Sequence, residues 1–70
     1  MERRQLNELL ATAYNLHVGP KRGGATMPPA EVSKLGRGDK AALCRLLEEK
    51  GGSDRFTTAD ARAAFAQVVR

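Results

Sequence analysis

The feature that most constrains the fold is the start of the last apolar segment, residues 56–69. Thr57 and Asp60 have the spacing of a capping box, in which each side chain accepts a hydrogen bond from the other residue's backbone N–H. Phe56 precedes the cap and is placed to pack on Ala61 as a hydrophobic staple. The apolar residues recur at helical spacing and form one stripe, which comprises Ala61, Ala64, Phe65, Val68 and Val69. The pattern predicts a helix over 57–69 whose apolar face needs other helices to cover it.

The composition favours the same class of structure for the rest of the chain. The 70 residues include no Ile and no Trp, and the β-branched residues are only Val and Thr. Strands are therefore disfavoured, whereas the Ala and Leu content favours helices. A chain of this length can bury one core and lies near the lower limit for doing so unaided. We predict a single small all-α domain over residues 1–70, with marginal stability.

Three further helices are predicted, which makes a small bundle of three principal helices and one short helix. The first helix covers about 2–16, with an apolar stripe formed by Leu6, Leu9, Leu10, Ala13 and Tyr14. The short helix covers about 28–35 and begins at Pro28-Pro29, because Pro loses no hydrogen bond at the first helical position. The third helix covers about 39–50, with Asp39 as its N-cap and Gly51-Gly52 at its end. Helices 39–50 and 57–69 are expected to form an antiparallel hairpin, with helix 2–16 packed across them.

A basic, glycine-rich segment at about 17–27 is predicted to be a mobile loop. Residues 17–26 contain three Gly and one Pro. Lys21 and Arg22 add positive charge, and the glycines allow the backbone to approach a phosphate closely. A nucleotide-hydrolysing P-loop is rejected, because the Lys-Arg pair precedes the glycines and no Ser or Thr follows a Lys. The alternative interpretation is a solvated linker.

The positive charge lies in the first two-thirds of the chain. The net charge is +4, and residues 1–45 carry eight basic against four acidic side chains, whereas residues 46–70 carry four of each. This asymmetry favours an anionic partner, although the same charges could serve only solubility. The side chains that we predict to contact nucleic acid or another partner are Arg3, Arg4, Lys21, Arg22, Arg37, Lys40 and Arg45.

The short helix 28–35 and helix 39–50, joined by Gly36-Arg37-Gly38, have the spacing of a helix-turn-helix. In that interpretation helix 39–50 enters a major groove with Lys40, Ala41 and Arg45 near base edges. An ordinary corner between two helices is the alternative. Helix 39–50 also opposes its own dipole, since Lys40 lies at the positive end and Glu48 and Glu49 lie at the negative end.

Several kinds of chemistry are excluded by what the chain lacks. The single Cys44 allows neither an internal disulfide nor a cysteine-rich zinc site, and the single His17 supports no catalytic triad or ligand cluster. No apolar run approaches the length of about 18 residues that a membrane helix requires. We therefore expect no catalytic, cofactor-binding or metal-binding residues and no membrane partner.

These observations predict a non-enzymatic basic helical binding module that contacts nucleic acid or a nucleoprotein through its N-terminal two-thirds. The alternative is a protein–protein interaction module, such as an adaptor, inhibitor or assembly subunit, or a self-associating protein. It would use the apolar faces and the charged helix 39–50. Aromatic residues make up only 4% of the chain, so stacking on single strands is disfavoured and the first prediction requires duplex phosphates. We expect an intracellular, cytoplasmic protein, with a nucleoid or nuclear location as the alternative. Because the chain begins with Met1, we interpret it as a whole small protein or an N-terminal fragment.

Overall fold

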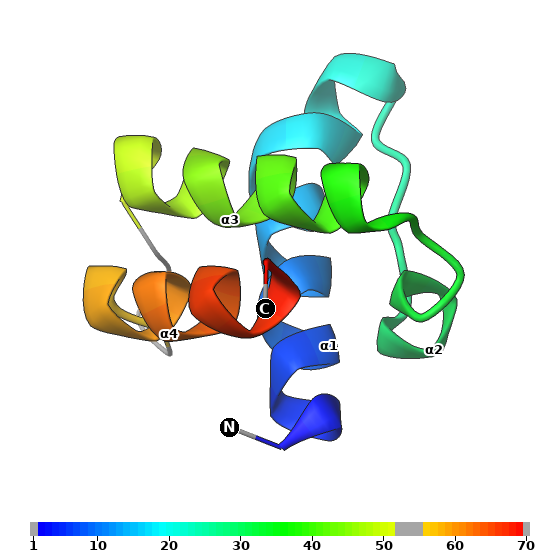
Figure 1. Cartoon of the computed structure of the whole chain (residues 1–70). Coiled ribbons are helices and arrows are strands. Elements are labelled where there is room, and N and C mark those ends of the chain that lie inside the picture. The colour runs from blue at the N-terminus through cyan, green and yellow to red at the C-terminus, as the bar shows by residue number, and fades with distance from the viewer. Residues whose placement is uncertain (1, 52–55, 70) are drawn as a thin grey trace.

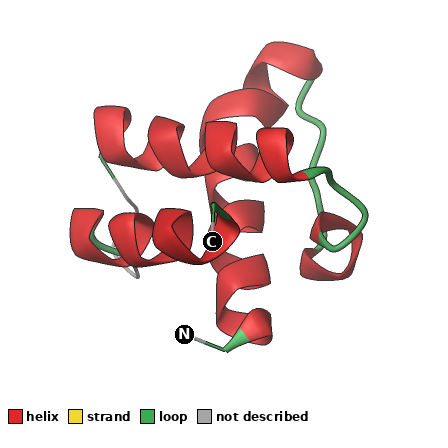
Figure 2. Ribbon diagram, viewed as in Figure 1, coloured by secondary structure: helices red, strands yellow, loops and turns green. Residues whose placement is uncertain are grey.

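The computed structural model describes residues 2–51 and 56–69, and within these ranges the chain is all-α without strands. The predicted fold class is therefore confirmed. Figure 2 shows that most of the described backbone is helical. The elements, in chain order, are α1 (Arg3–Ala13), the π-helical turn η1 (Tyr14–Val18), the 3-10 turn η2 (Gly19–Arg22), α2 (Pro29–Val32), α3 (Arg37–Lys50) and α4 (Thr58–Val68).

The helices α3 and α4 form an antiparallel hairpin, and α1 crosses behind both of them (Figure 1). An ion pair joins the two hairpin helices, with Arg62 Nε 2.9 Å from Glu48 Oε1. The short α2 lies beside α1 at the end of the hairpin where α3 begins. This arrangement confirms the predicted packing of the first helix across the last two.

One cluster of small and medium-sized apolar side chains forms the core between these helices. Its buried members are Leu9, Leu10, Ala11, Ala13, Val32, Leu43, Cys44, Leu47, Ala61, Ala64 and Val68. Two positions of the predicted α4 stripe depart from it, because Phe65 is half-buried and Val69 is 47% exposed. Four of the buried core residues are alanines, which bury little apolar area each. The marginal stability stays a prediction.

The capping box that begins α4 is present as the sequence predicts. The Thr57 backbone N–H donates to Asp60 Oδ2 at 2.8 Å, and the Asp60 N–H donates to Thr57 Oγ1 at 3.3 Å. Phe56 packs against the core next to this cap. Two of the unpaired N–H groups at the start of α4 are therefore satisfied by side chains.

The predicted loop over 17–27 is shorter in the structure, because helical turns continue through Arg22. Pro20 lacks the N–H that would continue the α-helical hydrogen bonds, and the Gly19 N–H donates to the Tyr14 carbonyl in a wider turn. A Cβ at Gly19 would overlap the carbonyl oxygen of Ala25. The loop that follows is held at Met27, whose N–H donates to Asn15 Oδ1 at 2.7 Å. The mobility of this segment stays a prediction.

The boundaries of α1, α2 and α3 also differ from the predicted ones. The first helix, predicted over about 2–16, is α-helical over Arg3–Ala13 and continues as the π-helical turn η1. The α-helical part of the predicted helix 28–35 ends at Val32, and residues 33–35 form a turn. The helix predicted to begin at Asp39 begins at Arg37, with Gly36 in the N-cap position. Asp39 is therefore wrong as the N-cap and lies in the first turn, where a carboxylate still favours the helix dipole. Gly51, with φ of 81°, ends α3 as predicted, and Gly52 lies outside the described residues.

Candidate functional site

Three of the seven predicted contact residues surround one surface pocket of about 330 Å³. Arg3 comes from the first turn of α1, and Arg37 and Lys40 come from the first turns of α3. Leu6 and Val68 supply apolar surface, and none of the described residues that line the pocket is acidic. The crossing of α1 behind α3 brings these cationic side chains together although 34 residues separate Arg3 from Arg37. We call this pocket, with Arg3, Arg37 and Lys40, the basic pocket.

The helix dipole adds to the positive potential of the basic pocket. The N-terminus of α3 carries partial positive charge, and no side chain caps it. Placing Arg37 and Lys40 at this end costs stability, about 0.3–1 kcal/mol for each charge at an exposed position. The carboxylate of Asp39 lines a different hollow, on the other side of α3. The basic pocket therefore concentrates cationic side chains from two helices at a helix end that is itself positive.

Neutral polar side chains complete the pocket and were missed by the sequence analysis. They are Asn7 of α1, Ser33 after α2 and Gln67 of α4. Amide and hydroxyl groups are common partners of phosphate oxygens in nucleic-acid complexes. A helical-period search could have paired Arg3 with Asn7, which lies four residues further along the same face. Nothing in the sequence pattern places Gln67 at the same pocket as Lys40, because that grouping depends on how α4 packs.

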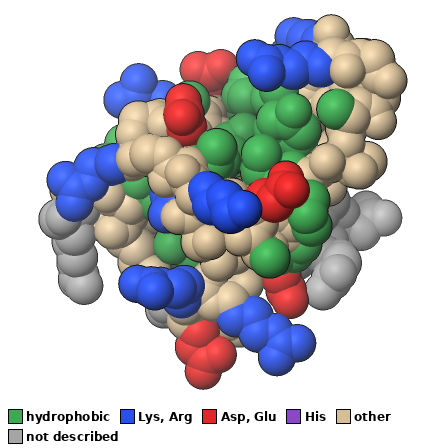
Figure 3. All heavy atoms as spheres, turned by 90° about the vertical axis from the view of Figure 1, so that its right-hand side faces the viewer, with side chains coloured by type: hydrophobic (Ala, Val, Ile, Leu, Met, Phe, Trp, Pro, Cys, Tyr) green, Lys and Arg blue, Asp and Glu red, His purple; other side chains and the backbone are tan. Residues whose placement is uncertain are grey.

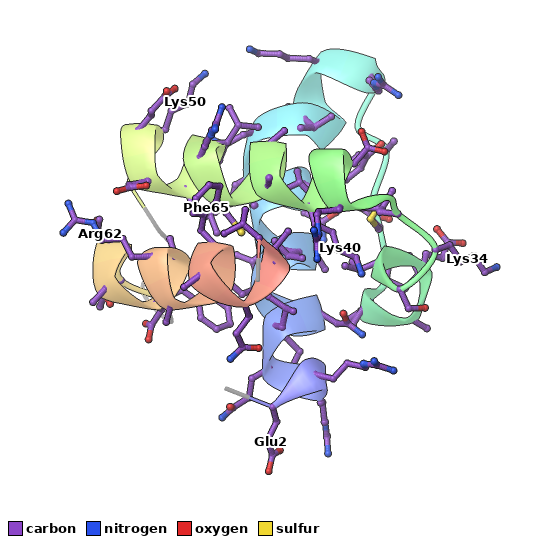
Figure 4. The ribbon with its side chains drawn as sticks, viewed as in Figure 1. Glu2, Lys34, Lys40, Lys50, Arg62 and Phe65 are labelled. Carbon is purple, nitrogen blue, oxygen red and sulfur yellow. The ribbon has the colours of Figure 1, made fainter. Side chains whose placement is uncertain are left out.

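Arg4 and Arg45 lie outside the basic pocket and have intramolecular contacts of their own. Arg4 Nε is 3.7 Å from Glu8 Oε1, one turn further along α1. The guanidinium carbon of Arg45 lies 5.6 Å from the centroid of the Phe65 ring, within the range of a cation–π interaction. Figure 4 shows Phe65 between α3 and α4. The Arg45 side chain therefore covers part of the half-buried aromatic ring at the hairpin.

Lys21 and Arg22 form a second basic group on η2, away from the basic pocket. Both side chains are exposed, and Arg22 lines an apolar hollow between η1 and α3. In Figure 3 basic side chains lie at the top of the molecule, directly above a group of hydrophobic side chains. The structure therefore divides the seven predicted residues among several surfaces and does not form a single continuous patch from all of them.

The helix-turn-helix interpretation does not fit the geometry of α2 and α3. The helix α2 is a single turn of four residues. Lys40 lines the basic pocket, whereas Arg45 lies over Phe65 and borders another hollow. Lys40 and Arg45, two of the three side chains placed near base edges in that interpretation, thus lie on different faces of α3. The arrangement is a corner between two helices.

The described titratable groups outside the basic pocket include no cluster of metal ligands and one buried thiol. Among residues 2–51 and 56–69, no group of three His, Cys, Asp or Glu side chains could hold a metal ion. Burial raises the pKa of the Cys44 thiol to about 11, and the nearby Glu48 carboxylate adds to this increase. A thiol with a raised pKa is a poor nucleophile at neutral pH. None of the described helices has the length and hydropathy of a membrane-spanning segment.

Comparisons with known proteins identified no relative of this chain. Neither a protein-family model, nor a curated protein, nor a solved structure matches the chain.

Proposed function

We propose that this protein is a non-enzymatic binding module that contacts the phosphates of duplex nucleic acid, free or within a nucleoprotein. The observation that carries the proposal is the basic pocket. Arg3 of α1 and Arg37 and Lys40 of α3 line it, and no acidic side chain does so within residues 2–51 and 56–69. Guanidinium and ammonium groups form strong, charge-assisted hydrogen bonds with phosphate oxygens. The proposal implies an intracellular location, in the cytoplasm or, where the partner is DNA, in the nucleoid or the nucleus.

A phosphate is favoured over other anions by the combination of donors. Two guanidinium groups and one ammonium group provide directional hydrogen bonds together with charge, and Asn7, Ser33 and Gln67 lie at the same pocket. The N-terminus of α3 also favours an anion at this end of the helix. Contacts of this kind position a protein on the nucleic-acid backbone without reading its sequence. The proposal therefore predicts binding with little sequence preference.

A duplex is favoured over a single strand because the protein offers little aromatic surface for base stacking. Tyr14, Phe56 and Phe65 are partly buried and pack against the core. Arg45 also lies over the Phe65 ring. Proteins that bind single strands without sequence preference rely on aromatic rings on which bases stack. The contacts available here are charge and hydrogen bonding, which suit the regularly spaced phosphates of a duplex.

The first prediction concerns the affinity of this protein for duplex DNA and duplex RNA at several salt concentrations. We expect binding that weakens steeply as salt increases, because contacts with phosphates release condensed counterions. Lys40→Gln should weaken binding uniformly across sequences and reduce the magnitude of the salt slope by about 1. Fluorescence anisotropy with labelled duplexes measures both quantities.

Lys50→Gln is the matched control for this experiment. Lys50 lies on the same helix as Lys40, at the opposite end, and its replacement removes the same charge (Figure 4). We expect Lys50→Gln to keep a near wild-type affinity and salt slope. Equal losses in the two variants would show that only net charge matters and would overturn the basic pocket as the site. Absence of binding at low salt would overturn the proposed function and leave the protein–protein alternative.

That alternative is supported by a separate observation on the opposite side of α3. Ala42 is exposed there, and Leu46 is only half-buried between two shallow hollows. An uncovered apolar face of this kind is typical of a surface that contacts another protein.

A further inference from the structure

The outer face of α3 is bordered by two hollows that share Ala42 and Leu46. One hollow, of about 450 Å³, lies between α3 and η1, and Tyr14, Val18 and Met27 contribute to its apolar lining. The other, of about 530 Å³, runs along the opposite flank of α3 past Gly38 and Arg45. Figure 3 shows hydrophobic side chains gathered on the upper part of the molecule on this side. The outer face of α3 is therefore apolar at its centre and charged at both ends.

The residues on this face are distributed symmetrically about Ala42. Asp39 and Arg45 each lie three residues from it, and Gly38 and Leu46 each lie four residues from it. Each pair joins opposites: an acid with a base, and a residue without a side chain with a large apolar residue. In two antiparallel helices related by a two-fold axis through Ala42, each residue faces its pair member on the other helix.

We propose that the outer face of α3 is the interface of a homodimer, in which α3 packs antiparallel against α3 of a second copy of this chain. Asp39 of each copy then pairs with Arg45 of the other, so the interface contains two equivalent ion pairs. Leu46 of each copy covers Gly38 of the other. The outer face of α3 carries both members of each pair at equal distances from Ala42. Two copies of this face are therefore complementary to each other when the two helices are antiparallel.

The shapes of the central residues allow the two helices to approach closely. No atom of the described residues would lie within 4 Å of a Cβ at Gly38, so the space above it is open for an incoming leucine side chain. Ala42 at the centre adds only a methyl group. Helices pack at interaxial distances of about 8–10 Å, and small side chains at the crossing point permit the shorter distances. Covering the half-buried Leu46 and the apolar lining of the hollow would supply the hydrophobic contribution.

The charged residues of this face are available for contacts between copies. Neither Asp39 nor Arg45 forms an ion pair with another residue in the described ranges, and both are exposed. The guanidinium carbon of Arg45 lies 5.6 Å from the centroid of the Phe65 ring, and this cation–π contact requires no hydrogen bond from the guanidinium to a carboxylate. Glu49 of one copy would lie towards the Leu35 end of the other, in the hollow that Arg22 also lines. A further ion pair, between Glu49 and Arg22 of the other copy, fits this arrangement.

The dimer proposal is independent of the proposed contact with nucleic acid. Arg37 and Lys40 line the basic pocket on the side of α3 that faces α1, whereas Ala42 lies on the outer side. Dimerisation through α3 would therefore leave both basic pockets uncovered and relate them by the two-fold axis. Either proposal can fail without affecting the other.

A charge-exchange experiment tests the homodimer and its geometry. Sedimentation equilibrium of the wild-type chain from about 1 μM to about 1 mM is expected to show a rise from the mass of one chain to that of two. Asp39→Arg and Arg45→Asp, each alone, place like charges opposite each other at both pairs and are expected to remain monomeric. In an equimolar mixture of the two variants, positions 39 and 45 are both basic in one chain and both acidic in the other. Opposite charges then face each other at both pairs, and we expect the mixture to form a heterodimer.

Ala42→Glu provides a second variant in case a charge exchange prevents folding, which circular dichroism would detect. Ala42 is exposed, so this substitution is expected to keep the helical content and melting temperature of the monomer while abolishing the dimer. A wild-type chain that stays monomeric up to the highest concentration would overturn the proposal. So would a dimer that persists in Ala42→Glu, or folded charge variants that fail to associate when mixed.

Discussion

At the scale of single residues, Cys44 is a buried side chain whose chemistry the fold suppresses. It is 1% exposed, and burial raises the pKa of its thiol to about 11 from an ordinary value of 9.0. Because the pKa is higher in the folded chain than in the unfolded chain, the folded state favours the neutral thiol. This contribution to stability is complete below about pH 9 and is lost as the pH rises from about 9 to about 11.

We therefore predict that the free energy of unfolding decreases between about pH 9 and pH 11, and that Cys44→Ala removes the part due to the thiol. That part is roughly 2–3 kcal/mol from the conversion of pKa differences into free energy. Urea unfolding of both proteins across this pH range measures the difference. Rapid reaction of the folded protein with a thiol reagent at pH 8 would contradict the burial on which the prediction depends.

The burial of single residues also shows where a prediction from the sequence pattern becomes inaccurate. The spacing of α4 places Phe65 on the apolar stripe, yet the ring is half-buried under Arg45, and Ala61, Ala64 and Val68 are the buried members. An apolar stripe shows which face of a helix points to the core. It does not show which residue of that face is buried most deeply, because neighbours three and four residues apart share the face. How deeply each side chain is buried depends on the partner helix, and the pattern of one helix contains no information about its partner.

At the scale of helices and turns, the capping box of α4 is a local feature with a measurable energy. Thr57→Ala removes the hydroxyl that accepts from the Asp60 N–H and is predicted to cost about 1 kcal/mol, with a range of about 0.5–2. Thr58→Ala is the matched control, since Thr58 is exposed at the first helical position and has no capping role. Chemical denaturation should show a clear loss for the first variant and little change or a small gain for the second. Equal effects would mean that the box does not contribute to stability.

The helices that sequence reasoning located best are those whose signals are local. The cap of α4 and the apolar spacing of α1 involve residues within one or two turns, and both appear as predicted. The turn through Pro20 could not be predicted in this way. Composition favours a loop there, but Gly19 packs under Ala25 and Asn15 holds Met27, and these contacts extend the helical turns to Arg22. The start of α3 was misplaced because Asp39 suits the first helical turn as well as the N-cap.

At the scale of the whole molecule, the distribution of charge matters more than the net charge of +4. The excess of basic over acidic residues lies within residues 1–45, and three of these basic residues, Arg3, Arg37 and Lys40, line one pocket. The sequence could not predict which basic residues share a surface. That grouping arises because α1 crosses the hairpin, which places the first turn of α1 beside the first turn of α3. Arg4 is adjacent to Arg3 in sequence and pairs instead with Glu8.

This distribution predicts that two identical charge removals, Lys40→Gln and Lys50→Gln, have opposite effects on stability. Lys40 lies near the positive end of the α3 dipole and beside Arg3 and Arg37, so Lys40→Gln should stabilise the unbound protein at low salt by about 0.3–1 kcal/mol. Lys50 lies in the last turn, where a cation is favourable, so Lys50→Gln should destabilise the protein by a similar amount. Urea denaturation at low and high salt measures both effects, which should diminish together as salt screens the charges.

Affinity for duplex nucleic acid is expected to change in the opposite sense to stability for Lys40→Gln and to remain unchanged for Lys50→Gln. A residue that costs stability in the unbound protein and contributes affinity in the complex is typical of a site shaped by binding. Lys40→Gln could instead lower the stability at every salt concentration. That result would mean that packing of the Lys40 aliphatic stem stabilises the protein more than its charge destabilises it. It would contradict an electrostatic cost in the unbound basic pocket that phosphate binding offsets. Comparison of the two variants therefore distinguishes a pocket whose charges lower stability and favour anion binding from a surface that is basic without such a cost.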